Sequence, residues 1–193
     1  RELYQADHLT AMLTWRVWWL IAIYFTVAVG TNAASAYFPK LLQAQFQSAS
    51  TSQIGWLAAL PHLCAVIGMT LFGISSDRQA ERRRHLSGAA SLAALGWALI
   101  AWSPSPMISL LGLCVAQTGM MSMLPIFWTL PTMFLTGAAA AGGVALINSV
   151  ANIGGFLGAS LLGQFGLWSM VACLIVGALL ASTLGDKPSL RSR

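Results

Sequence analysis

The stretch Gly73-Ile-Ser-Ser-Asp-Arg-Gln-Ala-Glu-Arg-Arg-Arg-His85 decides the fold class of this chain. It holds six charged residues of a chain with 10 Lys and Arg and 5 Asp and Glu, and no charged residue follows it from Leu86 to Gly185. A water-soluble globule needs charged side chains over its surface, and an uncharged run of this length cannot supply them. We therefore predict that the chain lies in a lipid bilayer and that this stretch is a loop at the membrane surface.

The composition points the same way, with 193 residues, 57% hydrophobic, 8% charged and a mean hydropathy of +0.72. Because about 20 apolar residues cross a hydrocarbon core of about 30 Å as a helix, the apolar runs predict an all-α membrane protein with six transmembrane helices. The predicted spans are residues 17–38, 54–74, 86–102, 107–128, 137–163 and 167–184, which form one bundle over residues 17–185.

The two ends of the sequence are more polar. Residues 1–16 are predicted to be the end of a cytoplasmic linker with an amphipathic pattern, either a helix at the membrane surface or a disordered segment. Residues 186–193 form a basic tail. The sequence does not begin with Met and shows no signal-peptide pattern, so we expect it to be a piece of a longer protein.

The basic residues predict the orientation of the chain. Six spans place both termini on one side, and every Lys and Arg except Lys40 then lies on that side. Positive charge is retained in the cytoplasm, so both termini and the charged loop are predicted to be cytoplasmic in the plasma (inner) membrane. The net charge of +5 follows from this bias and does not indicate nucleic-acid binding.

No pattern for a metal, a cofactor or catalysis stands out. Cys64, Cys114 and Cys173 lie singly in apolar runs and are predicted to be packing residues. A serine hydrolase at Ser160 would need a histidine nearby, yet His85 belongs to the cytoplasmic loop at the other end of the membrane. We therefore expect neither an enzyme nor a bound cofactor.

Several polar residues are predicted to lie at mid-membrane depth. Asn148 and Asn152 are four residues apart, so they share one helix face. A buried amide in hydrocarbon is costly unless it is bonded, so these two either bridge helices or line a polar cavity, and the residues alone leave both readings open. Gln117, Thr118 and Asn32 are expected at similar depth in other spans, where they can converge with the two asparagines.

Three further residues have two readings each. His62, beside Pro61, is either a proton relay or a helix-packing histidine, and the absence of a carboxylate from the predicted spans favours packing. Trp128 either belongs to an interfacial aromatic belt, the favoured reading, or walls a cavity. Asp77 either accepts hydrogen bonds from the N-terminus of a neighbouring helix, as one step of a conformational switch, or is a solvated loop charge.

Three motifs together resemble the major facilitator superfamily and, more narrowly, its anion:cation symporter family of organic-acid transporters. They are Gly73-x3-Asp77-Arg78-x3-Arg82-Arg83, then Phe127-Trp128-x2-Pro131, and then the long Ala138-Ala-Ala-Ala-Gly-Gly-Val-Ala-Leu-Ile-Asn148-Ser149-x2-Asn152-x-Gly154-Gly155-Phe156-x-Gly158. By this resemblance the six spans correspond to helices seven to twelve, the C-terminal half of a twelve-helix fold.

The resemblance implies transport of a small organic anion, a carboxylate or sugar acid, by alternating access with cation (proton) coupling. The implied substrate-binding positions are Asn32, Trp128, Thr129, Asn148 and Asn152. The implied conformational latch on the cytoplasmic side is Gly73, Asp77, Arg78, Arg82 and Arg83. The implied partners are the bilayer, the anion and an N-terminal six-helix half, which would carry the coupling carboxylates, the substrate-binding arginines and the helix that meets Asp77.

One departure from the family concerns residues 164–166, where the connection between the last two helices is shorter than usual. It implies a shortened or displaced last helix.

The alternative function is a truncated, transport-inactive half or a membrane assembly partner.

Overall fold

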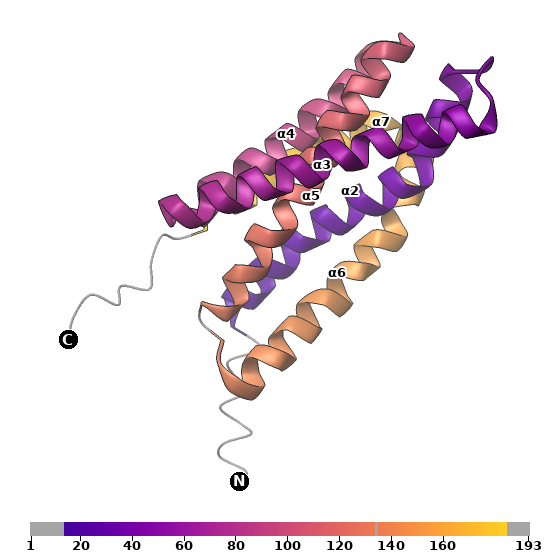
Figure 1. Cartoon of the computed structure of the whole chain (residues 1–193). Coiled ribbons are helices and arrows are strands. Elements are labelled where there is room, and N and C mark those ends of the chain that lie inside the picture. Colours follow the sequence, from indigo (N-terminus) through magenta and orange to yellow (C-terminus); the bar gives the residue numbers. More distant parts are fainter. Residues whose placement is uncertain (1–13, 134, 185–193) are drawn as a thin grey trace.

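The computed structural model describes residues 14–133 and 135–184, and within these ranges the chain forms six helices and no strand (Figure 1). The predicted all-α class is therefore confirmed. The predicted surface segment up to residue 13 and the basic tail lie outside the described residues. The helices are α2 (Trp15–Gln45), α3 (Thr51–Gln79), α4 (Arg82–Trp102), α5 (Pro106–Thr132), α6 (Gly137–Phe165) and α7 (Leu167–Ser182).

Five of these helices, α2 to α6, are long and apolar enough to cross a membrane. The sixth, α7, is equally apolar in character but has only 16 residues. It is separated from α6 by Gly166 alone, whose positive φ of 71° reverses the chain and suits a residue without a Cβ. The Ser169 hydroxyl donates to the Gly166 carbonyl at 2.6 Å and so stabilises this turn.

α2 is longer than the predicted first span, which ended at Phe38 before Pro39. The helix continues through Pro39 to Gln45, because Leu41 and Leu42 are buried against the bundle and outweigh the one backbone bond that the proline removes. α3 then begins with a capping box, in which the Gln53 N–H donates to Ser50 Oγ at 3.4 Å and the Ser50 N–H donates to Gln53 Oε1 at 2.8 Å.

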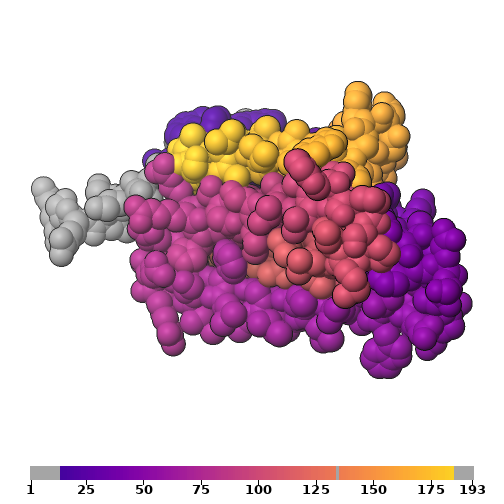
Figure 2. Space-filling view, turned by 90° about the horizontal axis from the view of Figure 1, so that it is seen from above, coloured from indigo at the N-terminus to yellow at the C-terminus, as the bar shows by residue number. Residues whose placement is uncertain are grey.

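The bundle is built around α2, α5, α4 and α7. Each of these helices packs on two others of the set: α2 contacts α5 and α7, and α4 contacts the same two helices. Figure 2 shows α7 (yellow) lying along α4 (magenta) on one face of the molecule. The side of this group formed by α2 and α5 is therefore opposite the side formed by α4 and α7.

α4 and α5 approach each other closely because small residues line their contact. A Cβ added at Gly96 would lie 2.2 Å from the Ala116 backbone nitrogen, and one added at Gly119 would lie 2.3 Å from the Ala93 backbone nitrogen. Small residues that allow backbones to touch are a general means of joining helices in lipid, where the hydrophobic effect does not.

α3 and α6 are packed on one side only, α3 chiefly against α5 and α6 chiefly against α2 (Figure 1). In the most apolar stretch of α2 and of α5, 61% of the residues are buried, compared with 17% in α3 and 22% in α6. The two helices therefore flank the α2–α5 side and leave most of their own apolar surface uncovered by the described residues.

Candidate functional site

Glycines on α6 bring this helix against α2 and determine where the candidate site forms. A Cβ added at Gly158 would lie 2.4 Å from the Val29 carbonyl oxygen, and one added at Gly155 would lie 2.6 Å from Asn32 Nδ2. A side chain at Gly158 would meet the backbone of α2 and force the two helices apart, whereas one at Gly155 would displace the Asn32 side chain. The Gly-rich motif of the sequence therefore acts here as the packing surface on which α6 meets α2.

The same contact brings Asn32 next to the α6 face that carries the two asparagines. Asn152 precedes Gly155 by three residues and Asn148 precedes Asn152 by four, so all three share that face. All three asparagine side chains are exposed in the described structure. They do not bridge α2 and α6 by a hydrogen bond within the described part, so the helix-bridging reading is not supported.

The hydrogen bonds of these amides leave their acceptor atoms available. Asn32 Nδ2 donates to the Ala28 carbonyl at 2.9 Å, and Asn152 Nδ2 donates to the Asn148 carbonyl at 2.7 Å. Each bond stays within one helix and uses one of the two hydrogens of the amide. The other hydrogen and the oxygen remain for a ligand with hydroxyl or carboxyl groups.

Trp128 belongs to an aromatic cluster that joins α5 to α2. Tyr24 stacks on Phe127 with ring centroids 4.8 Å apart, and it meets the edge of Trp128 at 4.8 Å. Trp128 is half-buried and packs on Tyr24 and Phe127. These contacts do not distinguish a cavity wall from an interfacial belt, so both interpretations stay predictions. Thr129, next along α5, donates its hydroxyl to the Ile126 carbonyl at 2.7 Å.

Tyr24 was not among the residues that the sequence singled out. The only feature of the sequence that could have pointed to Tyr24 as a site residue is its position eight residues before Asn32, which corresponds to about 12 Å along α2. The predicted substrate positions thus form two groups along α2: an amide group against α6 and an aromatic group against α5. Within the described residues, no hydrogen bond or ring contact links the two groups.

Gln117 and Thr118 do not converge with the asparagines as expected. Thr118 packs against α3, where its Cγ2 would lie 2.2 Å from a Cβ added at Gly68. Gln117 is only 7% exposed and lines a separate hollow of about 210 Å³ between α2, α3 and α5. His62 lines the same hollow and is exposed among the described residues, and both interpretations of this histidine stay predictions.

The charged stretch forms a tight turn and not a long loop. α3 continues to Gln79, Ala80 takes a left-handed conformation with φ of 53°, and α4 begins at Arg82. Arg82 forms an ion pair with Asp77, and it also donates to the buried Ser76 hydroxyl at 3.1 Å. The expected partner of Asp77 was a helix of another half, yet the structure gives this carboxylate a partner in the first turn of α4.

Other side chains brace this turn. Arg84 pairs with Glu81 at 3.2 Å, and His85 bonds the Glu81 carbonyl through Nδ1 at 2.6 Å and Ser75 Oγ through Nε2 at 2.9 Å. Gly73 has no heavy atom within 4 Å of the position where a Cβ would lie. Among the predicted latch residues, Asp77 and Arg82 therefore contact each other, whereas Gly73 and the exposed Arg78 face open space.

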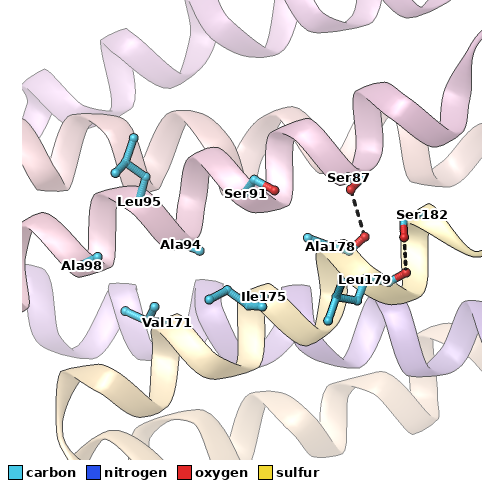
Figure 3. Close-up of a pocket in the computed structure, with 10 residues that line it drawn as sticks. All are labelled: Ser87, Ser91, Ala94, Leu95, Ala98, Val171, Ile175, Ala178, Leu179 and Ser182. Carbon is cyan, nitrogen blue, oxygen red and sulfur yellow. Dashed lines mark hydrogen bonds between the residues drawn. The ribbon is translucent and has the colours of Figure 1, made fainter.

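Another hollow, larger than the one lined by Gln117, lies between α4 and α7 and has a volume of about 360 Å³ (Figure 3). Its lining is mostly Ala, Leu, Val and Ile. Ser87 donates to the Ala178 carbonyl at 2.9 Å and Ser182 to the Leu179 carbonyl at 2.7 Å, so these hydroxyls already serve the helix backbones. Size alone therefore does not mark the functional site. Across residues 14–133 and 135–184 there is also no cluster of His, Cys, Asp and Glu suited to a metal ion.

Comparison with known proteins supplies the family. The pattern of the Major Facilitator Superfamily matches residues 5–159. A "Putative tartrate transporter" of Agrobacterium vitis is 36% identical over 178 residues, covering 88% of this chain and 39% of that protein. A "Quinolone resistance transporter" of Acinetobacter baumannii is 39% identical over 153 residues, covering 79% of this chain and 35% of that protein. "Inner membrane transport protein RhmT" of Escherichia coli is 30% identical over 183 residues, covering 90% of this chain and 42% of that protein.

The helices and these matches together define a multi-pass membrane protein of a transporter class and not an enzyme. The chain belongs to the Major Facilitator Superfamily. It spans 39%, 35% and 42% of the lengths of the three relatives, respectively.

Proposed function

We propose that this chain forms one six-helix half of a transporter that moves a small organic anion, a carboxylate or sugar acid, across the inner membrane. The observation that carries the proposal is the amide group formed by Asn32, Asn148 and Asn152, whose side chains are exposed on helices without a charged residue at that depth. An amide facing hydrocarbon is costly, whereas an amide facing a polar substrate is not. The tartrate named for one relative is such an anion.

The missing part of the site is proposed to come from a second six-helix half. α3 and α6 flank the α2–α5 side and leave apolar faces that the described residues do not cover. A second bundle placed against this side would cover both faces and would enclose the amide and aromatic groups between the halves. In such transporters the two bundles rock about a mid-membrane site, which gives alternating access. We assign this chain to helices seven to twelve.

The carboxylates of cation coupling are proposed to belong to the partner half. The described helices hold no Asp or Glu between Thr14 and Ser76, or between Arg82 and Leu184. A carboxylate that takes up and releases a proton during transport must therefore come from elsewhere, as must the arginines that would pair with the substrate. The chain supplies the polar and aromatic wall of the passage.

The turn between α3 and α4 is proposed to be a cytoplasmic latch. We expect this turn on the inner side, together with both termini, because positive charge is retained in the cytoplasm. The Asp77–Arg82 pair and the bond from Arg82 to Ser76 hold the two helices at a fixed angle. The exposed Arg78, the half-buried Arg83 and the open space at Gly73 face the region where a partner helix would slide during rocking.

The test is uptake of labelled organic acids, tartrate first, by cells that express this chain alone or together with the N-terminal half of the Agrobacterium vitis relative. We expect uptake only from the pair. Asn152→Leu in the pair should reduce uptake about tenfold or more, because it removes a polar group that binds substrate. Ser160→Ala, an exposed hydroxyl two turns further along α6, is the matched control and should leave uptake unchanged.

Two results would count against the proposal. Uptake by the isolated chain would show that it needs no partner half. Absence of uptake from a pair that co-purifies in a stable form would instead favour the alternative, a transport-inactive half.

A further inference from the structure

The hollow between α2, α3 and α5 contains polar groups that the proposed site does not use. Gln117 is 7% exposed, lines this hollow, and its side chain has no hydrogen-bond partner within the described residues. The amide atoms of Gln117 are not among the fully buried unbonded atoms of the described residues, so they reach the surface of the hollow and are free to bond a ligand there. The cavity volume of about 210 Å³ suits a group of a few heavy atoms.

His62 adds a proton acceptor to the same hollow. Its Nδ1 lies 3.1 Å from the Ala58 carbonyl oxygen, which can only accept, so Nδ1 carries the hydrogen in the neutral ring. Nε2 is then a free acceptor that gains a hydrogen only on protonation. The other described histidine differs, because both ring nitrogens of His85 are engaged in the turn between α3 and α4.

α2 contributes an acceptor to the hollow as well. Residue 39 is proline, so the N–H that would bond the Ser35 carbonyl in a regular helix is absent. The Ser35 hydroxyl donates to the Thr31 carbonyl at 2.9 Å, which leaves its oxygen as an acceptor. The hollow thus combines the Gln117 amide, which has two donor hydrogens, with oxygen acceptors of Ser35 and the His62 imidazole. Nε2 of this imidazole accepts a hydrogen bond when the ring is neutral and donates one when it is protonated.

No fixed charge lines the hollow. The lining residues of α2, α3 and α5 include no Lys, Arg, Asp or Glu, and His62 is their only titratable group. The nearest titratable side chains along these helices are Lys40 and Tyr37 on α2, Cys64 on α3 and Cys114 on α5, and none of them lines it. A carboxylate entering without a counter-charge would pay a large desolvation cost.

We propose that this hollow is a carboxyl subsite, in which Gln117 and His62 bind one carboxyl group that enters together with one proton. This inference rests on the proposed function, because it identifies where an acid group of the transported anion would lie, about one turn beyond Asn32 along α2. The proton comes from the aqueous medium and is taken up at His62 Nε2. Nε2–H then donates to one carboxylate oxygen, and the Gln117 amide donates to the other.

The test follows the His62 ring by nitrogen NMR in the purified chain in detergent micelles, with isotope-labelled histidine and sodium acetate as the probe. Acetate is expected to move the Nε2 signal of His62 saturably toward the protonated position, whereas chloride at equal ionic strength does not. The His85 signals serve as an internal control and should stay in place. Because one proton binds with each carboxylate, the apparent affinity for acetate should rise as the pH falls.

Variants separate the subsite from general effects. Gln117→Leu should weaken acetate binding about tenfold or more, and His62→Gln should remove the pH dependence of any remaining binding, which tryptophan fluorescence follows. Ser91→Ala in the hollow between α4 and α7 is the matched control and should bind as the wild type does.

The inference is overturned if acetate gives no saturable shift at His62, if the affinity does not change with pH, or if Gln117→Leu binds normally. Its failure is distinguishable from failure of the proposed function. Uptake by the paired halves that depends on Asn152 but not on His62 would reject the subsite alone. Acetate binding at His62 without uptake by the pair would reject the proposed function alone.

Discussion

Replacing Gly119 by alanine tests the close packing of α4 on α5, on which the whole bundle depends. The new Cβ would lie 2.3 Å from the Ala93 nitrogen and 2.6 Å from the Ala89 carbonyl oxygen, whereas ordinary contacts begin at 3.4 Å. Both obstructing atoms belong to the backbone of α4, so no side-chain rotation can relieve the overlap. The helices must move apart by a fraction of an ångström to about 1 Å over several turns.

The expected magnitude combines two opposing effects. Overpacking of a well-packed contact costs about 1–3 kcal/mol, and backbone obstruction places this site at the upper end. Alanine is a better helix former than glycine by about 0.5–1 kcal/mol. The net loss of unfolding free energy is therefore about 2 kcal/mol. For a domain of this size that lowers Tm by about 4–8 °C.

Thermal unfolding followed by circular dichroism in one detergent at one scan rate measures this effect. Gly88→Ala is the matched control, because Gly88 lies on α4 with no heavy atom within 4 Å of a new Cβ. It should raise Tm slightly through helix propensity alone. If Gly119→Ala unfolds at or above the wild-type temperature while Gly88→Ala behaves as expected, the reasoning from close backbone approach is refuted.

Three further predictions concern other contacts. Arg82→Gln should destabilise the chain by about 1 kcal/mol, because Arg82 donates a hydrogen bond to a buried hydroxyl. Arg84→Gln should cost less than about 0.5 kcal/mol, because the Arg84 side chain is 80% exposed. Equal shifts in Tm for the two variants would contradict this prediction. Trp19→Phe should lower the free energy of unfolding by about 1 kcal/mol, because it removes the 3.2 Å hydrogen bond from the indole N–H to a carbonyl of α7. An unchanged Tm would contradict this prediction. Mild oxidation should cross-link Cys64 of α3 to Cys114 of α5, because the two thiols lie near each other where these helices pack, and mass spectrometry finding both thiols free would show that α3 packs differently.

Much of the fold could be predicted from the sequence. The absence of charge from Leu86 to Gly185 requires lipid as the surrounding medium, and the apolar runs predict six helices. The ends of the helices could not be predicted as well. Pro39 suggested an end to the first helix, yet burial of Leu41 and Leu42 extends the helix beyond it.

The candidate site was predicted in part. Spacing alone places Asn148 and Asn152 on one face of a helix, because the helical period is fixed. It does not say which other helix meets that face. The close approach through Gly155 decides that Asn32 is the neighbour, and the packing of α5 on α3 directs Gln117 away from the asparagines and toward His62.

The sequence by itself therefore determined the medium, the number of helices and the polar residues that the bilayer makes expensive, because these depend on composition and on local periodicity. Only the tertiary structure decided which of those residues share a cavity, which partner Asp77 takes and which faces of α3 and α6 stay uncovered. The reason is physical: contacts between helices depend on how closely two backbones can approach, and that distance is set by small residues on both helices together.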